Sequence, residues 1–170
     1  MISKLQKFSS RRLFWLILMC VCAAFLSMAL FFQHVMGMKP CVLCIYQRLV
    51  FVCIFLVALL VSITIKYRAA RLIGLLIWLL LSVTGFVIAY HHIQIQLHPS
   101  PFGMCDMFII FPSWLPLDHI APWAFQVYGE CSTVPWVFAG WTLQQWLLIV
   151  YAISAPISLF FFVIQLIKRK

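Results

Sequence analysis

The run LFWLILMCVCAAFLSMALFF occupies residues 13–32 and contains no charged side chain. A helix needs about 20 apolar residues to cross the hydrocarbon core of a bilayer, so this run is long enough. Three further apolar stretches follow, at about residues 45–65, 72–90 and 146–167. They do not alternate apolar and polar residues as the strands of a lipid-facing barrel would. We therefore predict an all-α membrane protein, a four-helix transmembrane bundle in one domain covering residues 1–170.

The composition excludes an ordinary soluble domain. Of the 170 residues, 66% are hydrophobic and only 9% are charged, whereas soluble proteins carry about 25% charged residues. The run at residues 13–32 is longer than the roughly 7–15 apolar residues of a secretory signal core, and no small-x-small cleavage site follows it. We therefore interpret this run as a retained membrane anchor.

The positions of the basic residues predict the orientation of the bundle. Ten of the 12 Lys and Arg residues fall into three short segments: Lys4, Lys7, Arg11 and Arg12; Lys66, Arg68 and Arg71; Lys168, Arg169 and Lys170. Short segments rich in Lys and Arg remain in the cytoplasm. Both termini are therefore expected to be cytoplasmic, with loops at about residues 33–44 and 91–145 on the opposite side. The net charge of +9 reflects this topology, so no nucleic-acid partner is expected.

The segment KPCVLCIYQR, residues 39–48, carries the strongest chemical signal. Its Cys41 and Cys44 form a C-x-x-C motif at a predicted helix start, where unpaired N–H groups and the helix dipole favour a thiolate. Thiolates are the species that attack disulfides. Both residues lie on the predicted non-cytoplasmic side, where disulfides form and persist. The motif therefore predicts a redox-active cysteine pair, facing the periplasm in a bacterium.

Arg48 lies four residues after Cys44 and therefore one helical turn deeper on the same face. Charged residues within membrane spans are costly and usually mark function. The guanidinium is a candidate to stabilise a Cys44 thiolate, or to bind the carbonyl oxygen of an electron acceptor dissolved in the membrane. The alternative is a side chain that extends to the outer membrane interface and keeps its charge in water.

The loop at about residues 91–145 contains a second cysteine pair, Cys105 and Cys131, and six prolines that oppose a long helix. Between these cysteines, residues 107–117 read MFIIFPSWLPL and are too few to span a membrane. This segment is suited either to rest at the membrane interface or to pack against the end of the bundle. A Cys105–Cys131 disulfide would serve as a structural staple or, beside a reactive dithiol, as its exchange partner.

Two other uses of these cysteines fit the sequence less well. Attachment of haem to C-x-x-C requires a histidine after the second cysteine, where this chain has Ile45. A zinc site built from all four cysteines would use two closely spaced pairs, but Cys105 and Cys131 are far apart in the sequence. No metal is therefore expected. The three cysteines within predicted spans are expected to pack as small apolar side chains: Cys20, Cys22 and Cys53.

Several segments together resemble the DsbB family of bacterial inner-membrane disulfide-generating proteins. They are FQHVM at 32–36, KPCVLCIY at 39–46 with Arg48, PSPF at 99–102 with Cys105 and Asp106, FP at 111–112 with WLPLD at 114–118, and QWLL at 145–148. The segments follow the order of the family and cover nearly the whole chain. One departure is Gln47, where the best-known members carry an acidic residue.

The resemblance implies a protein of the bacterial inner membrane that reoxidises DsbA, a periplasmic thioredoxin-like dithiol oxidase. The electrons would pass to a membrane quinone, ubiquinone or menaquinone. By the same resemblance, Cys105 would form the mixed disulfide with the partner, and Cys131 would then attack Cys41. Cys44 would be released in turn and would interact with the quinone ring.

Two further positions are implied to lie beside the quinone, Arg48 and His92. The alternative for His92 is a histidine that is merely interfacial, next to His91. Within the enzyme class, the alternative is an oxidase that serves a different thioredoxin-like partner.

Two other classes of protein fit the sequence less well. A transporter or channel would need polar groups near the membrane midplane or matched broken helices, and only Pro156 indicates a break. A tetraspan scaffold with a stapled loop would leave Arg48 and the C-x-x-C motif unexplained.

Overall fold

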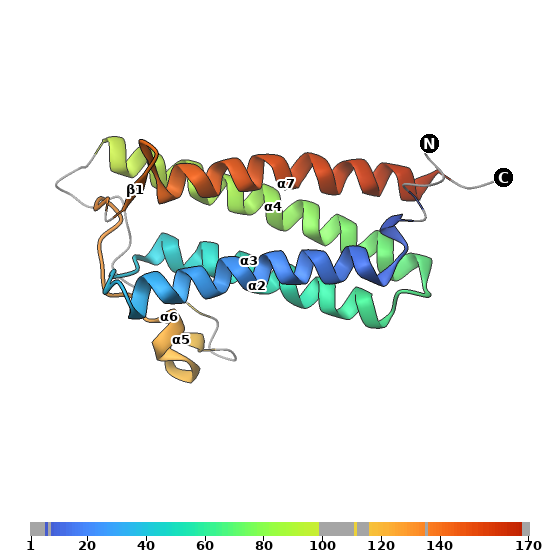
Figure 1. Ribbon diagram of the computed structural model, residues 1–170, viewed down its shortest axis with the longest axis horizontal. Helices are drawn as coiled ribbons and strands as arrows, with labels where there is room; N and C mark the ends of the chain where they lie inside the picture. The colour runs from blue at the N-terminus through green and yellow to red at the C-terminus, as the bar shows by residue number, and fades with distance from the viewer. Residues whose placement is uncertain (1–5, 7, 99–110, 112–115, 135, 168–170) are drawn as a thin grey trace.

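The computed structural model describes residues 6, 8–98, 111, 116–134 and 136–167. Four long helices form a bundle (Figure 1): α2 (Arg12–His34), α3 (Val42–Ile63), α4 (Arg68–Leu97) and α7 (Leu143–Leu166). Each of these helices is long and apolar enough to cross a membrane. The predicted all-α, four-helix membrane architecture is therefore confirmed.

The helices pack in a fixed order around one apolar core. α2 lies along α3, α3 along α4, and α4 along α7 in the most extensive of these contacts. The start of α2 and the end of α7 lie at the same end of the bundle, whereas the short loop elements gather at the opposite end (Figure 1). These loop elements are α5 (Leu117–Ile120), α6 (Pro122–Phe125) and the two-stranded sheet of β1 (Val137–Phe138) and β2 (Trp141–Thr142).

The helix ends at the loop side follow from local sequence. α3 begins after Cys41, whose sulfur accepts a hydrogen bond from the first helical turn. α7 begins at a capping box, in which the Thr142 and Gln145 side chains each bond the other residue's backbone. α2 is followed by a turn in which Gly37 has a φ of +66°, a conformation that glycine adopts at little cost.

The helices extend beyond the apolar stretches that predicted them. α3 starts at Val42, α4 continues to Leu97 and α7 starts at Leu143, so the long loop begins after residue 97, not at 91. An apolar window marks the part of a helix suited to lipid, whereas backbone hydrogen bonds continue into the polar residues at its ends. Consequently His92 and Gln144 are helical residues with fixed directions.

The described part of the long loop contains no long helix, as its prolines predicted. A tight hairpin pairs Val137 with Thr142, and both residues of its turn, Ala139 and Gly140, have positive φ. Most of the apolar segment at residues 107–117 lies outside the described residues. Its Phe111 and Leu117 pack against the cluster around Ile45 and Phe125, which favours burial against the bundle end for these two side chains.

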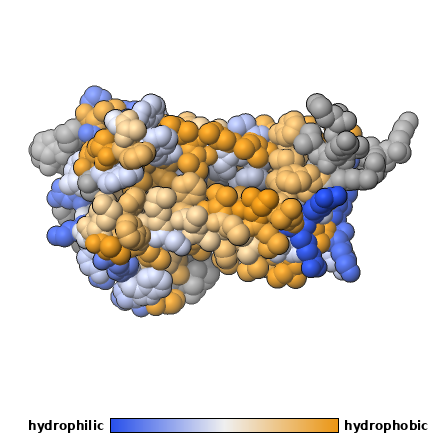
Figure 2. Space-filling view, in the orientation of Figure 1, coloured by the Kyte–Doolittle hydropathy of each residue, from blue (hydrophilic) through white to orange (hydrophobic). Residues whose placement is uncertain are grey.

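The core and the outer surface of the bundle are both apolar, as expected for a protein surrounded by lipid. Trp15, Leu75 and Tyr151 are fully buried, while many large apolar side chains on the helices face outward, including Leu60 and Leu80. Figure 2 shows this hydrophobic middle between more hydrophilic ends. Some polar atoms inside the bundle are paired between helices, as in the 3.0 Å bond from Trp78 Nε1 to Ser154 Oγ.

Candidate active site

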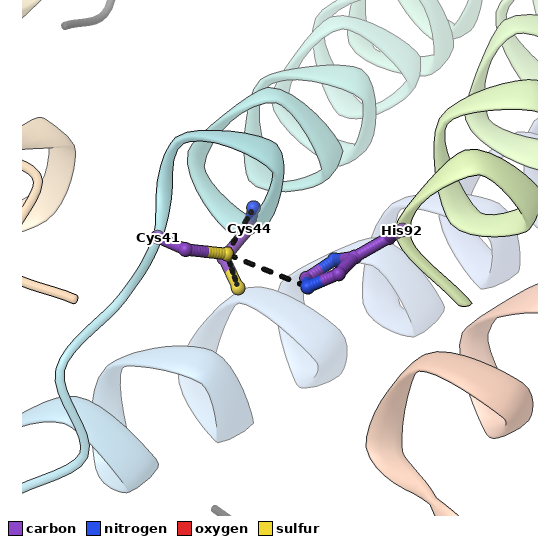
Figure 3. A group of neighbouring side chains, drawn as sticks. All are labelled: Cys41, Cys44 and His92. Atoms are coloured by element: carbon purple, nitrogen blue, oxygen red, sulfur yellow. Dashed lines mark hydrogen bonds between the residues drawn. The ribbon is translucent and has the colours of Figure 1, made fainter. Parts of the chain in front are cut away.

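The Cys41–Cys44 pair lies at the N-terminus of α3 (Figure 3). Cys41 is the residue just before the helix, and its Sγ accepts a 3.3 Å hydrogen bond from the backbone N–H of Cys44. The two sulfur atoms are 2.6 Å apart. Cys41 is 2% exposed, so attack on it must come from a neighbouring group within the fold. The pair therefore occupies the helix start that the sequence predicted.

The two thiols of this pair are not equivalent. The side-chain hydrogen bond with Cys44, and then burial, raise the pKa of the Cys41 thiol above its ordinary value. Loss of a proton from the reduced pair therefore leaves Cys41 protonated, and its S–H faces the Cys44 sulfur. Cys44 is consequently the candidate thiolate, which is the nucleophilic form of a cysteine.

His92 connects the two cysteine segments. Its ring projects from α4, is 1% exposed, and places Nε2 at 3.6 Å from Cys41 Sγ and 3.2 Å from the carbonyl oxygen of Cys131. Figure 3 shows the imidazole directed at the sulfur pair. An N–H on Nε2 satisfies the Cys131 carbonyl, whereas the buried Nδ1 has no hydrogen-bond partner in the described part of the chain. His92 is thus buried between cysteines rather than interfacial.

Cys131 lies in the same buried cluster as Cys41 and Ile95. It is 1% exposed and takes part in a disulfide. Two hydrogen bonds hold the preceding residues in place, because the N–H groups of Tyr128 and Gly129 donate to the carbonyl oxygen of Pro40 at 2.9 and 3.1 Å. The loop therefore packs Cys131 against Cys41, the residue that the family resemblance implies it attacks. Cys105 lies outside the described residues.

Arg48 lies one turn below Cys44 and is 7% exposed. Its Nη1 donates to Gln33 Oε1 at 2.8 Å and to the carbonyl oxygen of Ala124. Among the described residues no carboxylate pairs with this guanidinium, and its Nε has no hydrogen-bond partner. The side chain is held inside the protein. This placement contradicts the alternative in which Arg48 extends to the outer membrane interface and keeps its charge in water.

A cavity of about 440 Å³ opens beside Cys44. Its apolar walls come from α2, α3, α7 and the loop, and include Phe25, Phe32, Phe51, Trp136, Leu147 and Val150. Cys44, Gln47, Arg48 and Gln144 line it as well. Several buried polar atoms of these side chains lack partners among the described residues: Gln47 Oε1 and Nε2, Arg48 Nε and Gln144 Oε1. The cavity is thus mostly apolar with a few hydrogen-bonding groups near the sulfur.

Sequence reasoning missed Gln144. This residue is 4% exposed, and its Nε2 donates to Cys44 Sγ at 3.7 Å. It precedes the apolar stretch that predicted the fourth span, and a glutamine there carries no chemical signal by itself. Only the packing of α7 against the start of α3 reveals the contact.

The ligand atoms of Cys41, Cys44 and His92 lie within 4.8 Å of one another, close enough to consider a metal ion. Two thiolates on one tetrahedral zinc, with Zn–S bonds of about 2.3 Å, are about 3.7 Å apart. The observed 2.6 Å between the sulfurs is well below that separation. The two sulfurs, as placed here, would have to move apart to hold one zinc ion.

The fold and the site together define a class: a four-helix membrane protein with a buried cysteine pair at one end, beside an apolar cavity. A family model described as disulfide bond formation protein DsbB matches residues 11–161. This chain belongs to the DsbB family.

Curated relatives agree with this assignment. A disulfide bond formation protein B of Photobacterium profundum is 43% identical over 87% of this chain and 84% of its own length. One of Vibrio cholerae is 40% identical over 98% of this chain and 96% of its own length. One of Vibrio alginolyticus is 40% identical over 89% of this chain and 92% of its own length.

Proposed function

We propose that this protein is a dithiol:quinone oxidoreductase of the bacterial inner membrane, with its redox site on the periplasmic side. Its donor is a periplasmic thioredoxin-fold dithiol protein of the DsbA type, and its acceptor is ubiquinone or menaquinone. The observation that carries the proposal is the position of Cys44, which lines an apolar cavity while its partner Cys41 also packs against the loop cysteine Cys131.

The loop side of the site is suited to thiol–disulfide exchange. In the proposed sequence, a thiolate of the partner attacks Cys105 of a Cys105–Cys131 disulfide, and Cys131 leaves as a thiolate. Cys131 then attacks Cys41 of a Cys41–Cys44 disulfide, and Cys44 leaves as a thiolate. Shared burial of Cys41 and Cys131 in one cluster supports the second exchange. The second thiolate of the partner resolves its mixed disulfide with Cys105, which leaves as a thiolate. Cys105 then attacks Cys131 of the Cys41–Cys131 disulfide, and Cys41 leaves as a thiolate. The net result is one new disulfide in the partner, an intact Cys105–Cys131 disulfide and a reduced Cys41–Cys44 pair.

His92 supports this exchange from α4. Its Nε2 contacts both Cys41 Sγ and the Cys131 backbone, so one imidazole fixes the approach of the two segments. With Nε2 protonated, the ring directs an N–H at Cys41 Sγ, the sulfur that leaves as a thiolate when Cys105 attacks Cys131. It therefore acts on the sulfur–sulfur step, in addition to lining the cavity.

The cavity fits a quinone head group by size, polarity and position. Ligand sites are mostly apolar with a few polar groups that fix orientation. Here the partnerless Arg48 Nε and Gln47 amide supply donors to carbonyl oxygens inside apolar walls. A bound quinone supplies a two-electron, two-proton acceptor next to the Cys44 sulfur. Arg48 holds a positive charge near the place where negative charge develops, and its bonds to Gln33 and Ala124 keep it there.

Energetics require such an acceptor. A DsbA-type oxidant has a potential near −120 mV, whereas ordinary structural disulfides lie below about −300 mV. At roughly 1.4 kcal/mol per 30 mV, an ordinary disulfide would oppose the reaction by about 8 kcal/mol. A site that couples the cysteines to a quinone removes this obstacle. A scaffold protein with a stapled loop would have no need of such a site.

The test is anaerobic mixing of the purified protein with reduced DsbA and a short-chain ubiquinone. Loss of quinone absorbance should match partner oxidation one for one. Cys44→Ser should abolish quinone reduction while Cys105 still exchanges with the partner. Normal quinone turnover in that variant, or no electron transfer in the unaltered protein, would reject the proposal.

A further inference from the structure

The first turn of α7 places a side-chain amide against the reacting sulfur. Gln144 is 4% exposed, and its Nε2 lies 3.7 Å from Cys44 Sγ, within the longer range of hydrogen bonds to sulfur. Its Oε1 is also buried and has no hydrogen-bond partner among the described residues. Among the described residues, the only hydrogen-bond partner of the Gln144 side chain is therefore the Cys44 sulfur, although the side chain also lines the cavity.

We propose that Gln144 is a positioning residue that donates an N–H to the Cys44 thiolate and sets its nucleophilic reactivity. The inference deepens the proposed function, on which it rests for the role of Cys44. The C-x-x-C segment alone does not predict this contact, because Gln144 is 100 residues away in the sequence.

The local structure fixes the direction of the amide. The neighbouring Gln145 and Thr142 form the capping box, with bonds of 2.8 Å from Thr142 N to Gln145 Oε1 and 3.3 Å from Gln145 N to Thr142 Oγ1. The hairpin strand β2 ends at Thr142 and continues directly into the helix. The backbone of Gln144 is thus ordered from both sides, and α7 is in turn packed along α4. A pre-ordered donor loses little freedom when it binds the sulfur.

The charge distribution around Cys44 explains why one amide matters. The thiolate lies in an apolar cavity, where water contributes little to its solvation and each remaining donor counts more. The backbone N–H groups at the start of α3 and the buried Arg48 provide positive potential from one helix. Gln144 adds a donor from a second helix, so α3 and α7 hold the sulfur between them.

The alternative arrangement is a reversed role, in which the amide oxygen accepts a bond from the Cys44 S–H. Such a contact would favour the thiol instead of the thiolate. Two substitutions separate the two roles. Gln144→Met keeps the length of the side chain and removes both donor and acceptor. Gln144→Glu keeps the shape and an acceptor, but when ionised it has no N–H and brings negative charge to the sulfur.

The experiment measures iodoacetamide alkylation of the fully reduced protein in detergent, without partner or quinone, as a function of pH. Fragment-ion mass spectrometry assigns the label to Cys44. We expect Gln144→Met to slow Cys44 alkylation below the midpoint of its pH profile by about three- to tenfold, the size expected for one lost hydrogen bond of ordinary strength. The pH profile should move to higher pH, and Gln144→Glu should move it further in the same direction.

Gln145→Met is the matched control. It removes the capping-box bond made by the Gln145 side chain, so it loosens the same helix end but keeps the Gln144 amide, and its alkylation profile should move less than that of Gln144→Met. A Gln144→Met profile identical to the unaltered one overturns the inference, as does faster alkylation or an unchanged profile in Gln144→Glu. A shifted profile in Gln145→Met equal to that of Gln144→Met assigns the effect to the helix end and also overturns it.

The readout is independent of the proposed electron acceptor. If alkylation depends on Gln144 but no quinone is reduced, the inference stands and the proposed function fails. If quinone is reduced but Cys44 alkylation does not depend on Gln144, the proposed function stands and the inference fails.

Discussion

The N–H of Gly129 donates a 3.1 Å hydrogen bond to the carbonyl oxygen of Pro40, and this bond joins the long loop to the residue before Cys41. A Cβ added at Gly129 would lie 2.5 Å from the backbone oxygen of Lys39, which is too close for any real contact. The loop segment that carries Cys131 is therefore held against the C-x-x-C segment by an approach that leaves no room for a Cβ at residue 129.

Gly129→Ala is expected to slow exchange between Cys131 and Cys41 by tenfold or more, because the loop must withdraw from Pro40. Rapid acid quenching followed by thiol labelling measures this step. Gly140→Ala is the control, since it strains a turn in the same loop where φ is +80° but meets no atom within 4 Å. Equal rates in Gly129→Ala and the unaltered protein would contradict the role assigned to this contact.

His92→Phe removes the imidazole that contacts Cys41 and the Cys131 carbonyl. We expect exchange between the two cysteine pairs to slow by about tenfold, which corresponds to about 1.4 kcal/mol and to the loss of one buried hydrogen bond. The same quench assay measures it. His91→Phe changes the exposed neighbouring histidine and should leave the rate unaltered. An equal effect of both substitutions would assign the loss to the helix end instead of the contact.

Arg48→Met should raise the quinone concentration needed for half-maximal turnover by at least about tenfold, because a buried charge-assisted donor is lost. Partner–Cys105 exchange should change far less. Steady-state kinetics at varied short-chain ubiquinone measure the first quantity, and mixed-disulfide formation measures the second. Arg71→Met removes a comparable bond, from Arg71 Nη1 to the Ile65 carbonyl, at the other end of the bundle and should not alter quinone use.

Alkylation of the reduced protein at pH 8 should label Cys44 before Cys41. The hydrogen bond with Cys44 and burial raise the pKa of Cys41, so Cys41 remains a thiol at this pH and reacts slowly. The sign follows from the ionisation equilibrium, because a group whose pKa is raised holds its proton to higher pH. Fragment-ion mass spectrometry distinguishes the two sites. First labelling on Cys41 would reverse the assigned roles.

The bundle itself was predictable because each span requires only an uncharged apolar run of sufficient length. The C-x-x-C motif at a helix start was predictable for a similar reason, since Pro40 and the following apolar stretch define where α3 begins. These are local properties of the chain. The burial of Arg48 was not predictable, because it depends on acceptors from Gln33 and Ala124, which distant segments supply.

Two features of the site required the tertiary structure. The predicted third span ended at residue 90, yet α4 continues to Leu97 and directs His92 at the sulfurs. Gln144 similarly fell before the predicted fourth span, although it belongs to α7 and contacts Cys44. Hydropathy identifies the lipid-embedded part of a helix, whereas both of these residues lie in the polar turns beyond it.

The gathering of the redox groups at one end of the bundle has a bioenergetic consequence. Oxidation of a dithiol releases two protons, and reduction of a quinone takes up two. Cys41, His92 and Glu130 all line the cavity at the loop end, so the proposed function predicts that both proton transfers take place at the same face of the membrane. We expect turnover to be electroneutral, with a rate in proteoliposomes that does not change when a voltage is imposed across the bilayer. Disulfide formation by this protein then neither draws on the proton-motive force nor contributes to it directly.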